Sequence, residues 1–198
     1  MRDHLRAGIV IYNEGRFHAA HDAWEDQWLE LESGTDEERL LHGLIQCTAA
    51  VYHATTRNWT GTVGLAESGR TYLSTLPPRY RGVNVDDARS YLQRLEADPE
   101  LIERRPPVPL LHEDEQVDYD TLADPALAIA ASVLAEADGF DEALLERATE
   151  YAEENDRIRS LLADFVRESD DRGIVAQRLE DHIDRHESRR ADVDGLFD

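Results

Sequence analysis

The sequence predicts an all-α protein, a compact helical bundle with a buried central helix surrounded by other helices, plus C-terminal helices. Three observations predict this fold class. Apolar residues recur at helical spacing through most of the 198 residues, and no alternating strand pattern of useful length is present. The segment at about 35–56 is apolar around nearly its whole circumference, and a helix without a polar side is usually buried.

Five helices are expected in order along the first half of the chain, at about 3–13, 17–31, 35–56, 58–76 and 86–97. Gly15 marks the first turn, and Thr35 with Glu38 three residues later forms a capping box that opens the central helix. A proline pair follows the fourth helix, and Pro99 stops the fifth.

The chain is expected to divide into three parts. Residues 1–104 form the bundle core, 105–124 form a Pro-rich and acidic linker or strap, and 125–198 form an acidic helical extension packed on the core, with a second small helical unit as the alternative.

The extension begins at Asp124-Pro125, which is a good N-cap followed by a good first helical position. Its helices are expected at about 125–137, 140–154, 156–168 and 173–190. His182 and His186 lie four residues apart in the last of these, among acidic residues, and we expect a solvated helix face there.

The charge balance is strongly acidic. The chain has 43 Asp and Glu residues against 21 cations, all of them Arg, for a formal net charge of -22. This balance disfavours nucleic acid and anionic membranes as partners, because both are bound by basic patches. In about 1 M salt the screening length falls to about 3 Å, which removes most of the self-repulsion. We therefore expect a halophilic protein from a salt-accumulating organism, with loss of Lys through a GC-rich codon bias as the alternative.

The sequence also predicts a cytoplasmic location. Its longest apolar stretch, about ten residues over 126–135, is half of what a membrane-spanning helix needs. The N-terminal residues show no signal-peptide pattern. The single Cys47 cannot form an internal disulfide, which fits a reducing compartment.

The second predicted helix carries four polar residues beside its apolar stripe. His18, His21, Asp22 and Glu25 follow one another at steps of three, one and three residues, so they share one face. Imidazole nitrogens and carboxylate oxygens suit a divalent metal such as zinc, iron or manganese. The expected metal ligands are His18, His21 and Glu25. The spacing leaves open a metal site, a metal-free polar pocket and structural His–carboxylate pairing.

The buried third helix has one polar stripe, and buried polar groups need hydrogen-bond partners. We expect this stripe to find them on the second helix and to complete a pocket. The stripe consists of Arg39, His42, Gln46 and His53. The candidate pocket consists of His18, His21, Asp22, Glu25, Gln46 and His53.

Two blocks of sequence carry a recognisable pattern. Residues 12–28 read YNEGRFHAAHDAWEDQW, and the second block reads GLIQ at 43–46, AAVYH at 49–53 and NWTG at 58–61. Together they resemble domain-of-unknown-function family 309, in which an Asn-x-Gly turn precedes a helix close to His-Glu-Ala-His-Glu-x-Trp-Glu-x-x-Trp. The resemblance covers roughly residues 1–100. Two positions depart from the family pattern, because Ala19 and Asp22 stand where the family usually has Glu.

The resemblance implies a compact all-helical bundle around a central helix, and it implies no activity. The residues after about 110 look like a tail seen in haloarchaeal members of the family. The function expected from the residues is a His/carboxylate pocket that binds a divalent metal or a small molecule. The alternative is a non-enzymatic protein-interaction or homo-oligomeric scaffold module. The sequence names no catalytic residue and does not decide whether the protein is an enzyme.

Overall fold

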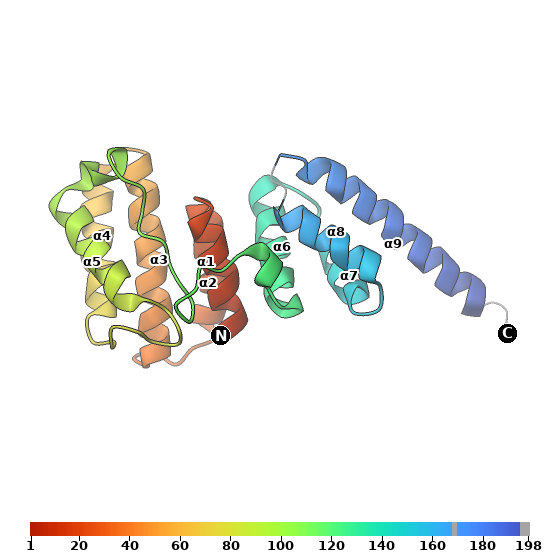
Figure 1. Cartoon of the computed structure of the whole chain (residues 1–198), viewed down its shortest axis with the longest axis horizontal. Coiled ribbons are helices and arrows are strands. Elements are labelled where there is room, and N and C mark those ends of the chain that lie inside the picture. The colour runs from red at the N-terminus through yellow and green to blue at the C-terminus, as the bar shows by residue number, and fades with distance from the viewer. Residues whose placement is uncertain (168–169, 195–198) are drawn as a thin grey trace. The chain divides into compact units, whose positions relative to one another are not determined.

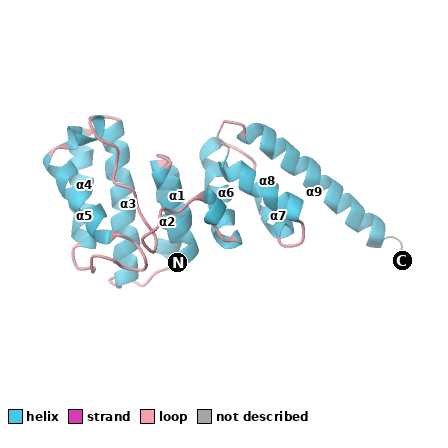
Figure 2. Cartoon of the chain, viewed as in Figure 1, coloured by secondary structure: helices cyan, strands magenta, loops and turns pink. Residues whose placement is uncertain are grey.

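Helices make up the regular structure of the described residues, 1–167 and 170–194, in the computed structural model (Figure 1). Loops join them, and this part of the chain contains no strand (Figure 2). The α-helices are α1 (Arg2–Asn13), α2 (Phe17–Leu29), α3 (Asp36–Thr55), α4 (Trp59–Leu73), α5 (Val85–Ala97), α6 (Asp124–Asp138), α7 (Glu142–Ala152), α8 (Asp156–Arg167) and α9 (Arg172–Asp194). Two short 3₁₀ helices, η1 (Pro99–Glu103) and η2 (Tyr119–Thr121), complete the described elements.

The predicted all-α class is confirmed, and each predicted helix is present with ends shifted by a few residues. The predicted N-cap of α6 is wrong by one residue. Asp124 is the first residue of α6 and Ala123 precedes it as N-cap, so Asp124 does not cap the helix as predicted. Its carboxylate instead accepts a hydrogen bond of 2.7 Å from Nε of Arg159.

The start of α3 forms only half of the predicted capping box. The Thr35 hydroxyl oxygen accepts from the backbone N–H of Glu38 at 3.2 Å. The Glu38 carboxylate does not return to Thr35 but accepts from the backbone N–H of Gly34 at 3.3 Å. Glu38 is drawn away because the indole N–H of Trp28 donates to its other oxygen at 3.0 Å.

The chain divides into two compact units, residues 1–118 and 119–198, of which 168–169 and 195–198 lie outside the described residues. In the first unit, α3 lies between α4 and the pair formed by α1 and α2 (Figure 1). Its residues without exposed surface include Leu40, Leu41, Leu44, Cys47, Thr48, Ala50 and Val51. The buried central helix is therefore confirmed. Burial also raises the pKa of the Cys47 thiol to about 12, so it is not a nucleophile at neutral pH.

Close contact between α1 and α2 depends on a glycine. A Cβ atom on Gly8 would lie 2.1 Å from Nε1 of Trp24 and 2.3 Å from its Cε2. Trp24 is fully buried, so the indole fills the space that a larger residue at position 8 would need. This contact orients α2, and with it the polar face that carries the predicted site residues.

A strap of irregular structure at 104–118 runs along the first unit and is fixed by two asparagines. Asn13 at the end of α1 forms two hydrogen bonds with the backbone of Leu110, at 2.8 and 2.9 Å. Asn84, just before α5, donates to the carbonyl of Pro109 at 3.2 Å and accepts from the amide of Leu111 at 2.8 Å. Leu110 between them has no exposed surface, so the strap contributes to the core of this unit.

The second unit packs α6 to α9 around apolar side chains that include Leu134, Leu161 and Ile183. Phe140 and Phe165 meet edge to face with ring centroids 5.4 Å apart. The expected packing of this extension on the bundle core, and the three-part division of the chain, stay predictions. No described helix has the length and apolar character needed to cross a membrane.

Candidate functional site

The polar face of α2 is the starting point of the candidate site. The helix buries Ala19, Ala20, Ala23 and Trp24, so the adjoining face at the same turns is left partly exposed. His18, His21, Asp22 and Glu25 lie on that face as the spacing predicts.

Asp22 lies between two imidazoles. One carboxylate oxygen is 3.0 Å from Nδ1 of His18, and the other is 2.9 Å from Nδ1 of His21. The same nitrogen of His21 is 3.8 Å from an oxygen of Glu25. One helix thus brings four side chains that can carry or exchange protons into one connected cluster.

Three members of this cluster have the arrangement that a small cation needs. One ligand atom each from His21, Asp22 and Glu25 can be chosen so that all lie within 4.8 Å of one another. Ligand atoms about 2.1 Å from a tetrahedral metal are separated by about 3.4 Å. The 2.9 and 3.8 Å separations from His21 lie on either side of that value. The cluster could therefore close on a metal with small side-chain movements.

The structure places His18 differently from the other three residues. Its side chain is 75% exposed, and its Nδ1 contacts Asp22 on the side away from His21. The potential ligands that lie close together are thus His21, Asp22 and Glu25. In this set Asp22 replaces His18, which was predicted from the sequence as the third ligand. Metal binding by His18, His21 and Glu25 stays a prediction.

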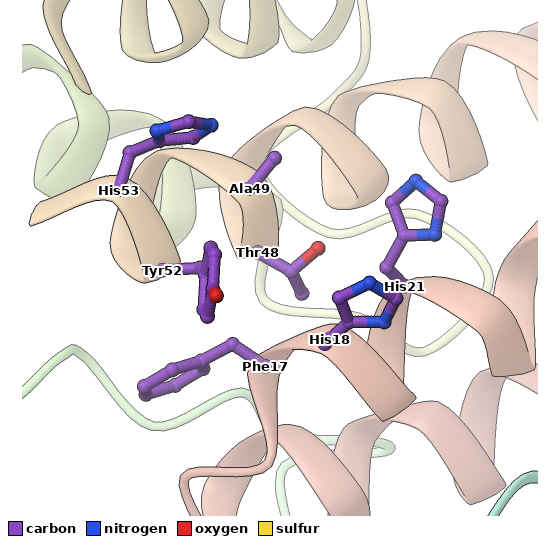
Figure 3. A pocket seen from close by; sticks show the side chains of 7 residues that line it. All are labelled: Phe17, His18, His21, Thr48, Ala49, Tyr52 and His53. Carbon is purple, nitrogen blue, oxygen red and sulfur yellow. The ribbon is translucent and has the colours of Figure 1, made fainter. Parts of the chain in front are cut away.

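A hollow of about 230 Å³ lies between α2 and α3 and reaches the cluster at His18 and His21 (Figure 3). In the close-up, two imidazoles come from α2, and a hydroxyl, a methyl group, a phenol and a further imidazole come from α3. The lining residues are Phe17, His18, His21, Thr48, Ala49, Tyr52 and His53.

The α3 side of the hollow presents both polar and aromatic groups. The Thr48 hydroxyl donates to the carbonyl of Ile45 at 2.8 Å and has no exposed surface, so it forms a buried part of the wall. Tyr52 is 44% exposed, and its ring lies edge-on to His18 with centroids 6.2 Å apart. The amide group of Asn58 donates to Nδ1 of His53 at 2.7 Å, so a neutral His53 carries its proton on Nε2.

Other residues of the predicted stripe do not line this hollow. The Cβ of Gln46 would be 3.2 Å from a Cβ added to Gly69, so Gln46 lies against α4. The His42 ring stacks on Tyr72 of α4 at 3.8 Å. Arg39 donates to Asp36 on its own helix at 2.9 Å. Of the four stripe residues, only His53 lines the hollow together with residues of α2.

His42 belongs to a separate buried network at the start of α3. Its Nδ1 is 3.2 Å from Glu38, which also accepts from Trp28 and Gly34. Burial alone would raise the pKa of Glu38, but the donors from Trp28, His42 and Gly34 outweigh it and bring this pKa below its ordinary value. This network satisfies its own polar groups and has a structural role.

Sequence reasoning missed Phe17, Thr48, Ala49 and Tyr52 as lining residues of the hollow. The signal available was their spacing, because Thr48 and Tyr52 are four residues apart and thus share a face of α3. Thr48, Ala49 and Tyr52 belong to α3, a helix that is apolar on almost every side, so no polar pattern distinguishes them.

The fold and the site define a class of protein: an all-helical bundle with a His/carboxylate cluster beside an open hollow. Residues 5–65 match the family model described as "Domain of unknown function (DUF309)". The resemblance predicted from the sequence is confirmed over this segment, which spans α1 to α3 and the first half of α4. No curated protein matches the chain.

Proposed function

We propose that the first unit binds a divalent transition-metal ion through His21, Asp22 and Glu25, and that the adjoining hollow receives a small molecule beside the ion. The observation that carries this proposal is the approach of three potential ligand atoms to within 4.8 Å of one another on one helix. His18 lies next to the ligand set and contacts Asp22, where it can orient that carboxylate.

The donor chemistry favours zinc, iron or manganese over calcium or magnesium. One imidazole nitrogen with two carboxylate oxygens suits the intermediate ions, whereas calcium and magnesium prefer oxygen alone. Three protein ligands leave a coordination position for water or a substrate, which is the arrangement of catalytic rather than structural metal sites. An ion here would polarise a bound molecule or lower the pKa of bound water.

The hollow supplies surfaces that a small ligand could use. Phe17 and Tyr52 offer aromatic faces, and His53 offers an imidazole. A lining that combines aromatic surface with polar groups is typical of small-molecule sites.

The setting proposed for this function is a salt-rich cytoplasm. The net charge of -22 and the absence of Lys support it, because such a surface is tolerated best when salt screens its repulsion. The same charge supports a function without nucleic acid or anionic membrane as partner.

Binding of zinc and cobalt to the full chain tests the proposal. Isothermal titration in molar KCl is expected to give one site per chain, and cobalt is expected to show visible bands that report nitrogen and oxygen ligation. Replacing Glu25 by Gln, or His21 by Ala, is expected to weaken zinc binding by about tenfold or more, since outer partners alone account for tenfold losses.

Asp26 provides the matched control, because it is an exposed carboxylate one residue further along the same helix. Asp26→Asn removes the same charge as Glu25→Gln and is expected to leave zinc affinity unchanged. Equal losses in these two variants would mean diffuse attraction by the acidic surface, and a parent protein without a saturable zinc site would refute the proposal.

A second candidate function is association with another protein or with a second copy. Leu29 is 68% exposed and Tyr52 is 44% exposed on the first unit, and contact with a partner would remove this apolar surface from water. Light scattering in molar KCl tests self-association: a dimer that Leu29→Ser converts to a monomer supports it, and a monomeric parent refutes it.

A further inference from the structure

A second hollow, of about 260 Å³, lies in the second unit between the start of α8 and the middle of α9. All its polar lining groups are cationic or neutral, and no carboxylate is among them in the part of the chain that the structure describes. The lining residues are Asn155, Arg157, His182, Arg185, His186 and Arg189. The two histidines are half-buried here, so the predicted solvated face is in part the wall of this hollow.

Three arginines meet at this hollow without carboxylate partners. Acidic residues outnumber arginines by 43 to 21 in this chain. Arg147, Arg159 and Arg190, from the same group of helices, each pair with a carboxylate. Among the described residues, no carboxylate comes within ion-pairing distance of the three arginines at the hollow: Arg157, Arg185 and Arg189.

The guanidinium of Arg185 is fixed in place at this hollow. Its Nε donates to the carbonyl of Asp181 at 2.6 Å, and one terminal nitrogen lies 3.0 Å from Nδ1 of His182, which also lies 2.9 Å from the carbonyl of Arg178. A guanidinium that donates to a neutral backbone carbonyl keeps its full charge for a ligand, and its remaining N–H groups stay available.

His186 supplies a buried donor without an acceptor. The Asn155 side-chain oxygen accepts from the amides of Arg157 and Ile158 at 3.1 and 3.3 Å, so its NH₂ group faces Nδ1 of His186, 3.4 Å away. Nδ1 therefore accepts, and the proton of a neutral ring is on Nε2. Nε2 is buried and has no partner among the described residues, a costly condition that a ligand oxygen would relieve.

We propose that this hollow binds the phosphate groups of a small phosphorylated molecule. Guanidinium groups form paired, charge-assisted hydrogen bonds with phosphate oxygens, and three of them match a ligand with several negative oxygens. The N-terminus of α8 adds its positive end at the same place. A small ligand is favoured over a long polyanion, because the net charge of -22 repels any chain that extends beyond this local basic group.

Calorimetric titration of the full chain with inorganic pyrophosphate, in KCl at fixed ionic strength, tests the proposal. One saturable site per chain is expected. Arg157→Gln, Arg185→Gln and Arg189→Gln are each expected to weaken binding by about tenfold, the usual effect of losing a hydrogen bond to a charged group. Each variant is examined by circular dichroism, so that loss of binding is separated from loss of the fold.

Arg178 is the matched control, because it is an exposed arginine of the same helix outside the hollow. Arg178→Gln makes the same charge change and is expected to keep pyrophosphate affinity within about twofold, since an exposed charge outside the hollow acts weakly in salt. Three results would overturn the proposal: no saturable binding at millimolar pyrophosphate, an equal loss in Arg178→Gln, or tighter binding to a short oligonucleotide or to anionic lipid vesicles than to pyrophosphate.

Discussion

The side-chain amide of Asn13 forms two hydrogen bonds with the backbone of Leu110, donating to its carbonyl oxygen at 2.8 Å and accepting from its N–H at 2.9 Å. The two residues are 97 positions apart in the sequence. The Asn13 side chain thus pairs with the strap as a neighbouring β-strand would, and it fixes the strap against the end of α1. An apolar side chain at position 13 could not satisfy the backbone N–H and C=O groups of Leu110.

Removing this amide is expected to destabilise the protein. Asn13→Ala leaves both backbone groups of the buried Leu110 without a partner, and each unpaired buried group costs about 1–3 kcal/mol. Chemical denaturation of the two proteins measures the difference. Glu14→Ala, at the exposed neighbouring position, serves as control and is expected to change the free energy of unfolding by less than about 0.5 kcal/mol. Equal stability of Asn13→Ala and the parent would contradict the role given to Asn13.

Two glycine-to-alanine substitutions are expected to have opposite effects. Gly8→Ala would place a methyl group 2.1 Å from the Trp24 indole nitrogen, so the free energy of unfolding is expected to fall by at least about 2 kcal/mol through overpacking. Gly64→Ala in α4 meets no atom within 4 Å and is expected to stabilise by up to about 1 kcal/mol through helix propensity. Thermal melts of both variants measure the effects, and a harmless Gly8→Ala would show that α1 and α2 are less closely packed than described.

The Glu38 carboxylate is expected to make stability depend on acid pH. Its pKa is lower in the folded protein than in the unfolded chain, because donors from Trp28, His42 and Gly34 outweigh the effect of burial. Because the pKa is lower in the folded protein, the carboxylate adds to the free energy of unfolding at pH values above the unfolded pKa of about 4.3. This contribution is lost as the pH falls through the folded pKa.

The parent is therefore expected to exceed Glu38→Gln in stability at neutral pH, and this difference is expected to shrink below about pH 4. Denaturation curves at several pH values measure it. Glu67→Gln, at an exposed site in α4, should show no such convergence with the parent. A difference in the free energy of unfolding between the parent and Glu38→Gln that is constant with pH would mean that the network stabilises the fold through packing and not through the charge of Glu38.

Stability is expected to fall when salt is diluted. A net charge of -22 repels itself over a screening length of about 10 Å at 0.1 M salt but only about 3 Å at 1 M. The melting temperature measured in a KCl series should therefore decrease from molar to low salt. A melting temperature that is constant or rises on dilution would remove the physical reason for assigning this chain to a salt-rich environment.

The helices and the polar face of α2 could be predicted because both depend on local spacing. Asn58 illustrates this, since its side chain accepts from the amide of Gly61 and starts α4 where the sequence indicated. His21, Asp22 and Glu25 meet because residues three and four apart on one helix are neighbours in any fold.

The α3 side of the hollow could not be predicted, because it depends on how α3 is rotated about its axis. That rotation follows from tertiary packing, in which Gly69 lets Gln46 approach α4 closely. Gln46 is thereby turned away from α2, while Tyr52 and His53 line the hollow. The two hydrogen bonds between Asn13 and Leu110 could not be predicted either, because no local sequence pattern links residues 97 positions apart.

The strap also determines the smallest fragment that can be expected to fold. The family-matched segment ends at residue 65, inside α4, but the core around it is completed by Leu92 of α5 and Leu110 of the strap, neither of which has exposed surface. A fragment cut at residue 65 would lose both, and one cut at 104 would leave the hydrogen-bonding groups of Asn13 and Asn84 without their strap partners. The compact unit that carries the α2–α3 hollow therefore extends to residue 118, well beyond the segment that the family model matches.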